Sequence, residues 1–174
     1  MYKRQKAQTA REAGLEPLSV ILMMQRERDP EAVARRFVNE NVKDVSAALK
    51  GAQDIIAETV SEDERSRQQV RSSFRREAII TSKVVKAKAD TEEAAKFSDY
   101  FDFSEPLRRC TSHRLLAMRR GENEGILRIS ISANDEECVE RIKRGFVHGY
   151  GKCSSLVAEA VEDSYKPVSH THLT

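Results

Sequence analysis

Hydrophobic residues recur every three or four positions over most of this 174-residue chain, which is the spacing of helices that bury one face. The longest such stripe covers residues 45–60. It follows Asp44, whose carboxylate can accept hydrogen bonds from the first turn of a helix. Asp29 followed by Pro30 predicts another helix start, and residues 17–24 are apolar on almost every side, which is typical of burial or of a partner contact. We therefore expect a mainly α-helical protein, folded as a multi-helix bundle or arm.

Cap signals predict further helices along the rest of the chain. Ser61 with Glu64 has the spacing of a capping box, which predicts a new, polar helix from there to about Ile80. The remaining predicted elements are a first helix that ends before Gly14, a helix from Asp90 or Thr91 carrying Phe97, Tyr100 and Phe101, a helical turn at Ser104–Pro106, a helix from Ser112 to Gly121, one from Asn134 through Arg144, and a last one from Ser154 or Ser155. The aromatic residues 97–103 are expected in the core, because their neighbours are acidic and not basic as in a base-stacking surface.

Only residues 125–132 alternate clearly with the period of two that indicates a half-buried strand. Weaker strand candidates lie near Lys83–Val85 and Phe146–His148. Since a lone strand is not stable without ladder partners, we expect an isolated strand near 125–132 that pairs poorly, or pairs with its equivalent in a second copy. That unpaired strand would be a route to self-association.

Composition indicates a charged surface, because 39% of the residues are apolar and 33% are charged. The net charge of +2 at pH 7 is too small to indicate a polyanion ligand by itself, so the placement of the charges must decide. No apolar run approaches the roughly 18 residues of a membrane span, and we expect no membrane contact. The odd, widely spaced set Cys110, Cys138 and Cys153 favours reduced thiols in the cytoplasm.

The best basic segment lies between residues 65 and 88. Arg67, Arg71 and Arg75 recur every four residues on a predicted helix and therefore share a face. The candidate nucleic-acid-binding residues are Arg67, Arg71, Arg75, Lys83, Lys86 and Lys88. A phosphate-contacting surface is the functional interpretation, and a solvated face offset by neighbouring acidic residues is the structural one.

Side chains that could carry catalysis or hold a metal are scattered. Cys110 and His113 have the spacing of two metal ligands, or of a nucleophile and its base, but no third group completes either set. Three glycines near the C-terminal end lack the preceding strand and the Lys-Ser/Thr of a phosphate loop: Gly145, Gly149 and Gly151. We expect no enzymatic activity, no metal site and no cofactor, and the residues alone indicate a scaffold.

Six segments have amino-acid sequences typical of one family: Thr9–Leu18, Arg36–Asn39, Thr81–Lys86, Lys96–Pro106, Ser112–Leu127 and Ala160–Lys166. In these segments the chain resembles the Tex family of bacterial transcription accessory proteins, which are RNA-binding proteins related to a eukaryotic elongation factor. Such proteins continue into a YqgF-type nuclease-like domain, helix-hairpin-helix elements and an S1 RNA-binding domain. The resemblance implies that residues 1–166 are a fragment of the family's N-terminal helical region. Residues 167–174 depart from the family pattern and are expected to be an irregular or added tail.

For function, the resemblance implies a non-catalytic helical scaffold that acts in transcription. It implies nucleic acid as partner, RNA in preference to DNA, bound mainly through domains outside this sequence, with RNA polymerase as a further partner. Two alternatives stay open. One is a region that holds the substrate of a YqgF-type nuclease, and the other is a protein–protein docking module that uses the apolar residues Val20–Met24.

Overall fold

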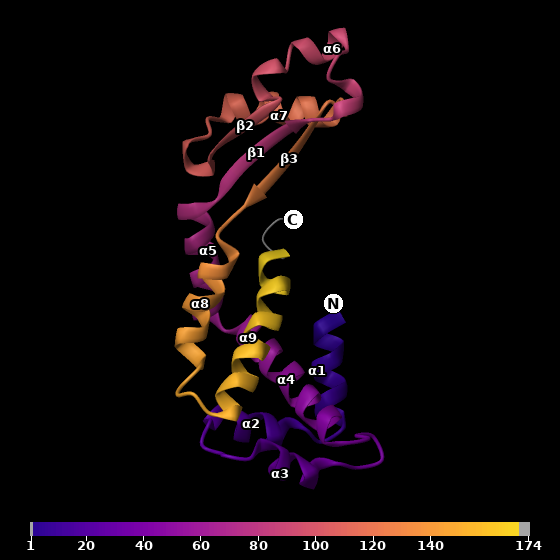
Figure 1. The fold of residues 1–174 in the computed structure, drawn as a ribbon, viewed down its shortest axis with the longest axis vertical. Coiled ribbons are helices and arrows are strands. Elements are labelled where there is room, and N and C mark those ends of the chain that lie inside the picture. The colour runs from indigo at the N-terminus through magenta and orange to yellow at the C-terminus, as the bar shows by residue number, and fades with distance from the viewer. Residues whose placement is uncertain (1, 171–174) are drawn as a thin grey trace. The chain divides into compact units, whose positions relative to one another are not determined.

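A computed structural model describes the backbone of residues 2–170 and the side chains of residues 4–165 (Figure 1). The chain forms two compact units, one from Met1–Val70 with Glu136–Thr174 and one from Arg71–Asp135. We call the first the helical unit and the second the sheet unit. The mainly α-helical class expected from the hydrophobic pattern is confirmed.

The helices that supply the helical unit are α1 (Tyr2–Glu12), α2 (Glu16–Met24), α3 (Pro30–Ala34), α4 (Val45–Glu62), the first half of α5 (Glu64–Glu77), α8 (Asp135–Phe146) and α9 (Lys152–His170). Two predicted caps are confirmed. Asp29 Oδ1 accepts a hydrogen bond from Ala32 N at 3.1 Å, and Asp44 Oδ1 accepts one from Ala47 N at 2.7 Å. Because α9 extends to His170, part of the segment expected to be a tail lies in its last turn, and residues 171–174 lie outside the described residues.

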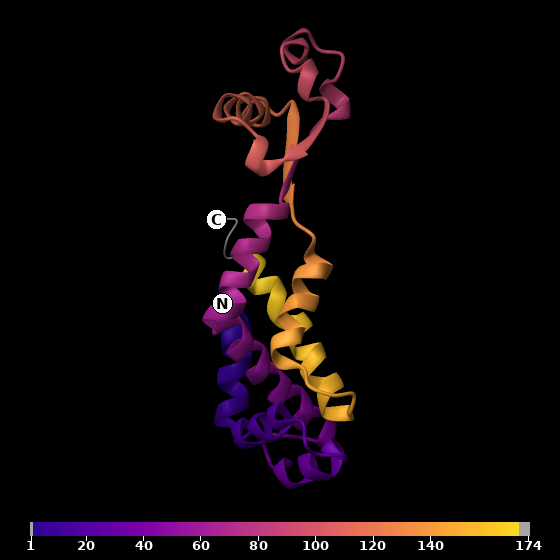
Figure 2. The same cartoon turned by 90° about the vertical axis from the view of Figure 1, so that its left-hand side faces the viewer.

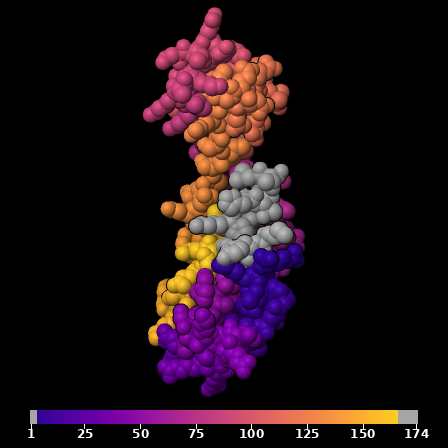
Figure 3. Space-filling view, turned by 90° about the vertical axis from the view of Figure 1, so that its right-hand side faces the viewer, coloured from indigo at the N-terminus to yellow at the C-terminus, as the bar shows by residue number. Residues whose placement is uncertain are grey.

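Helix α4 is the centre of the helical unit, because α1, α2, α3 and α9 all pack against it. Figure 3 shows the indigo N-terminal segment, which contains α1, lying against the purple segment that contains α4. The side chains that α4 buries include Ala48, Ala52, Ile55, Ile56 and Val60, which is the stripe read from the sequence. Polar contacts fix its neighbours: Gln53 Nε2 donates to Leu156 O on α9 at 3.0 Å, and Arg11 on α1 pairs with the buried Glu58.

The break between α4 and α5 differs from the predicted capping box. Helix α4 continues through Glu62, and the Ser61 hydroxyl donates back to Glu58 O at 2.7 Å instead of capping a new helix. Asp63 takes the capping role, since its Oδ2 accepts a hydrogen bond from Ser66 N at 2.8 Å. The capping-box prediction was therefore wrong by two residues.

The sheet unit holds three antiparallel strands in the order β2-β1-β3: β1 (Ile79–Val84), β2 (Asp102–Pro106) and β3 (Leu127–Ser132). Its helical elements are α6 (Glu92–Ala95), α7 (Ser112–Asn123) and the 3₁₀ turns η2 (Lys86–Lys88), η3 (Ser98–Tyr100) and η4 (Leu107–Arg109). A further 3₁₀ turn, η1 (Arg35–Phe37), follows α3 in the helical unit. Figure 2 shows α7 on one side of the sheet.

The prediction of an isolated strand near 125–132 was wrong. That strand is β3, and it pairs with β1 over its whole length, from Leu127 opposite Val84 to Ser132 opposite Ile79. Residues 79–84 were assigned partly to the end of a helix, but α5 ends at Glu77 and β1 begins two residues later. The unpaired strand on which self-association was predicted is therefore a paired strand of an intrachain sheet.

Two further elements of the sheet unit differ from prediction. Residues 104–106 were expected to form a helical turn and instead belong to β2, which adds to the free edge of β1. The helix expected to carry the aromatic residues is only the single turn α6, followed by η3. The predicted burial of the aromatic residues is confirmed in full only for Phe97, which is 4% exposed; Tyr100 and Phe101 are partly buried against the same small core, and Phe103 is partly buried outside it.

Gly121 was expected to end a helix, but α7 continues to Asn123. A Cβ built on Gly121 would lie 2.6 Å from Leu127 Cδ1 on β3. Glycine is present here because the helix approaches the strand closely and not because the helix ends.

Among residues 2–170, no helix combines the length and apolar character needed to cross a bilayer. Cys110, Cys138 and Cys153 are all free thiols.

Candidate nucleic-acid interface

The structure divides the six predicted binding residues into two groups, all with exposed side chains. Arg67, Arg71 and Arg75 form the helix group on α5, and Lys83, Lys86 and Lys88 form the sheet group at one end of the sheet. The boundary between the two compact units falls inside the helix group, between residues 70 and 71.

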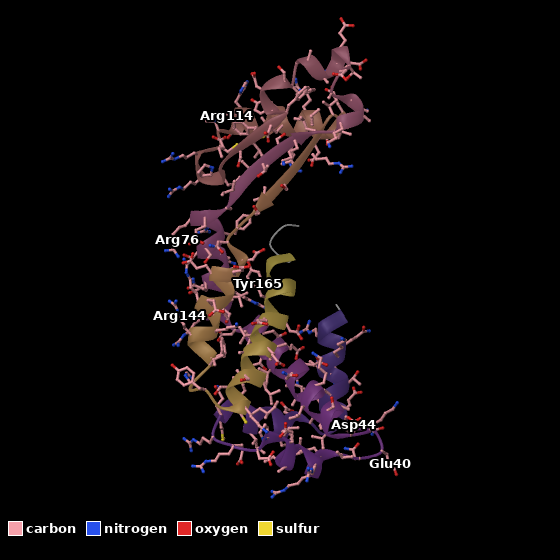
Figure 4. All side chains as sticks on the ribbon, in the orientation of Figure 1. Glu40, Asp44, Arg76, Arg114, Arg144 and Tyr165 are labelled. Carbon is pink, nitrogen blue, oxygen red and sulfur yellow. The ribbon has the colours of Figure 1, made fainter. Side chains whose placement is uncertain are left out.

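The helix group follows one face of α5, because its members are four residues apart. Arg67 Nε donates to Ser61 O at 2.9 Å, which holds this side chain against the end of α4. Neither Arg71 nor Arg75 takes part in an ion pair or a side-chain hydrogen bond with any described residue. Like charges four residues apart weaken a helix slightly, so the pair has no evident structural benefit to α5. Arg76, labelled on α5 in Figure 4, is also exposed.

The sheet group gathers where β1 ends. Lys83 is the second-to-last residue of β1. The 3₁₀ turn η2, which carries Lys86 and Lys88, follows shortly afterwards. Lys88 Nζ lies 3.5 Å from Glu124 O, just before β3 begins. A backbone hydrogen bond from Val85 N to Ile126 O, at 2.8 Å, holds the two chain segments together at this end.

Arg128 is a candidate that the sequence analysis missed. Its Cα is the direct cross-strand partner of Lys83, and both side chains are exposed. The alternation of residues 126–132 already placed Arg128 on the polar face of a strand. The sequence did not reveal that Lys83 is the cross-strand partner of Arg128, because residues 79–84 were not recognised as the strand that pairs with β3.

Side chains alternate between the two faces of this sheet. Ile80 and Ser82 lie on the face covered by α7 and are fully buried. The opposite face, which we call the open face, carries three cross-strand rows: Asp102, Lys83 and Arg128, then Ser104, Thr81 and Ser130, then Pro106, Ile79 and Ser132. Figure 1 looks onto this face, with α7 behind the strands.

A separate polar cluster lies on the covered side of the sheet. Arg114 on α7, labelled in Figure 4, pairs with Glu105 at 2.7 Å, and Cys110 lies close to the same carboxylate. Burial raises the pKa of the Cys110 thiol, and its hydrogen bond to Glu105 raises the pKa further. A raised pKa disfavours the thiolate, which is the nucleophilic form. Among the described residues, no group of three or more His, Cys, Asp and Glu side chains could hold a metal ion.

The apolar segment Val20–Met24 is only partly buried. Leu22 is fully buried, whereas Val20 is 50% exposed and Met24 is 61% exposed on the same side of α2. A second apolar feature is a groove of about 600 Å³ between α1 and α4, lined by residues that include Ala10, Leu15 and Gly51. The exposed pair Val20 and Met24 is the structural basis for the docking-module alternative.

Three relatives illustrate what this chain is similar to. It is 43% identical over 135 residues to the transcriptional accessory protein Tex of Neisseria gonorrhoeae, covering 78% of this chain and 18% of that protein. It is 43% identical over 136 residues to the protein YhgF of Escherichia coli K12, covering 77% of this chain and 17% of the relative. It is 28% identical over 178 residues to the S1 RNA-binding domain-containing protein 1 of Homo sapiens, covering 94% of this chain and 18% of the relative.

The chain therefore spans about a fifth of the length of these curated relatives. The family described as Tex central region-like matches residues 25–167, which include all of α4, all of the sheet unit and all of α8. This match covers both groups of exposed cations and Arg128. The chain belongs to the Tex central region-like family.

Proposed function

We propose that this chain is a non-catalytic helical scaffold of a Tex-like transcription accessory protein, and that it contributes sequence-independent contacts to RNA in the cytoplasm. The observation that carries the proposal is that Arg71 and Arg75 on α5 are exposed and have no partner among the residues that the structure describes. Lysine and arginine side chains supply most of the affinity for a nucleic-acid backbone.

The distribution of charge supports the same proposal. The sheet unit, residues 71–135, carries 13 Lys and Arg against 10 Asp and Glu, whereas the rest of the chain carries 17 against 18. The overall charge of +2 therefore understates the positive charge of residues 71–135. The names of two relatives, a transcriptional accessory protein and an S1 RNA-binding domain-containing protein, support RNA and transcription as the setting.

The docking alternative is favoured by one specific observation, the exposed pair Val20 and Met24 on α2. A docked protein, for which RNA polymerase is the family-based candidate, would cover this pair. The two roles use different surfaces. Variants of the cations on α5 should therefore affect RNA binding and not protein docking, and variants of Val20 and Met24 should do the opposite.

The test is a titration of a labelled single-stranded RNA and of a duplex DNA with the full chain at about 50 mM and about 200 mM salt. We expect RNA binding that weakens steeply with salt and that falls at least about tenfold in the Arg71→Glu, Arg75→Glu variant. The matched control is Arg35→Glu, Arg36→Glu, which reverses the same number of exposed charges on η1. Equal losses in both double variants would mean that only net charge matters, and no binding at about 50 mM salt would contradict the proposal for this chain.

A further inference from the structure

We propose that the open face of the sheet is a phosphate-binding surface for single-stranded RNA, in which Arg128 and Lys83 act as a pair. This inference rests on the proposed function and deepens it by naming the surface and the chemistry of the contact. Arg128 lies outside the basic segment of residues 65–88. It reaches this surface because β3 pairs with β1.

The first argument is the juxtaposition of two cations. Lys83 and Arg128 are direct partners across the β1–β3 ladder, and like charges in that arrangement destabilise a sheet. Neither side chain forms an ion pair with any described residue. Asp102 is the partner of Lys83 on the other side, but no Lys83–Asp102 ion pair forms, and β1 separates Asp102 from Arg128. An anion that contacts both cations would relieve their repulsion.

The second argument is the row of hydroxyl groups next to this pair. Thr81 lies between Ser104 and Ser130, and none of the three hydroxyls bonds to another described side chain or backbone group. Serine and threonine hydroxyls join arginine and lysine among the usual donors to phosphate and sugar oxygens. The two rows lie two residues apart along the strands, about 7 Å, so one short stretch of the RNA backbone can contact the cation row and the hydroxyl row together.

The third argument is what the open face lacks. Its nine positions hold no aromatic side chain, and stacking of bases on aromatic rings is the usual source of base contacts in single-strand binding. The face can therefore hold phosphates and sugars but has no aromatic ring on which a base can stack. We expect binding that is insensitive to base sequence, so that oligouridylate and oligoadenylate bind with affinities within about twofold of each other.

The experiment compares single substitutions in the full chain against labelled oligouridylate of about 12 nucleotides. Arg128→Ala should weaken binding about tenfold at about 50 mM salt and should reduce the salt slope by about 0.7, which corresponds to one phosphate contact. Arg128→Lys should restore most of the affinity. Asp102→Asn should strengthen binding, because it removes the one anionic side chain of the face.

The matched control is Arg120→Ala, which removes an exposed charge from α7 on the other side of the sheet. This variant should bind like the unchanged chain. Neither alanine variant should lower the melting temperature, since Arg128→Ala removes a like-charge neighbour and not a structural contact. Amide chemical-shift mapping should show perturbation at Thr81, Lys83, Arg128 and Ser130 on addition of the oligonucleotide.

The outcomes separate the two proposals. Binding that is lost in the Arg71→Glu, Arg75→Glu variant but unchanged in Arg128→Ala would overturn this inference and leave the proposed function standing. No RNA binding at about 50 mM salt would overturn both. Displacement of the oligonucleotide by polyglutamate at an equal charge concentration would overturn the phosphate assignment, because the face would then bind acidic peptides.

Discussion

Ser82 lies on the central strand β1 with 0% of its surface exposed, and its hydroxyl has no hydrogen-bond partner among the described residues. A buried hydroxyl without a partner costs free energy, whereas an apolar group of similar size does not. Ser82→Ala should therefore leave the free energy of unfolding unchanged or raise it by up to about 1 kcal/mol. Chemical denaturation monitored by circular dichroism would measure the change.

The matched control for this substitution is Ser154→Ala in the helical unit. Ser154 is also buried, but its hydroxyl donates to His148 O at 2.6 Å. Removing that bond should lower the free energy of unfolding by about 1 kcal/mol. A loss of stability in Ser82→Ala as large as the loss in Ser154→Ala would mean that the Ser82 hydroxyl has a partner in solution.

Single residues also mark what the sequence could predict. The caps at Asp29 and Asp44 were predictable, because a carboxylate before a helix satisfies local backbone groups. The pairing of Lys83 with Arg128 was not, because it depends on a contact between residues 45 positions apart. Of the candidate interface, the sequence supplied the six predicted cations, but their division into two groups and the addition of Arg128 required the fold.

At the scale of elements, two helices carry glycine for different reasons. Gly121 lies inside α7, where an added Cβ would meet Leu127 Cγ at 2.9 Å and Phe97 Cδ1 at 3.2 Å. Gly145 lies near the end of α8, where an added Cβ would meet nothing within 4 Å. Gly121→Ala should destabilise the protein by about 1–3 kcal/mol through overpacking between helix and strand. Gly145→Ala should instead stabilise it by about 0.5–1 kcal/mol, because alanine is the better helix former.

Thermal unfolding of the two variants beside the unchanged chain gives the test. Opposite signs are expected from the same chemical change, so differences in expression or purity cannot imitate the result. If Gly121→Ala were neutral, α7 would be able to move away from β3, and the close approach seen in the structure would not be required for stability.

Elements also explain why the sheet was missed. β2 has the sequence Asp-Phe-Ser-Glu-Pro, which contains residue types that are depleted in strands. It is stable as an edge strand because β1 supplies its ladder partner, and Pro106 lies at its end, where the lost donor matters least. Only one residue separates β1 from the long polar helix α5. The spacing of hydrophobic residues therefore changes from that of a helix to that of a strand without the glycine or proline that usually marks a turn. The helices were predictable because their pattern is local, whereas the sheet depends on pairing between distant segments.

At the scale of the whole molecule, the two units differ in the size of their cores. Among the described residues, 20 buried side chains form one connected core in the helical unit, whereas the sheet unit buries a cluster of Ala94, Phe97, Ile126 and Leu127 and, outside that cluster, Ala78, Ile80 and Met118. Buried apolar surface is the main source of stability. The sheet unit should therefore open more readily than the helical unit, although it carries most of the proposed RNA contacts.

Hydrogen exchange followed by mass spectrometry would test this difference. Amides of α4 should exchange last, because α4 lies at the centre of the larger core, and amides of α6 and η3 should exchange first. We expect the strands β1 and β3 to exchange at least about tenfold faster than α4. RNA should slow the exchange of these strands if it binds the open face, and should leave α4 unchanged. Equal exchange rates in the strands and in α4 would show that the two units open as one cooperative structure, and the smaller core would then not be a separate weak point.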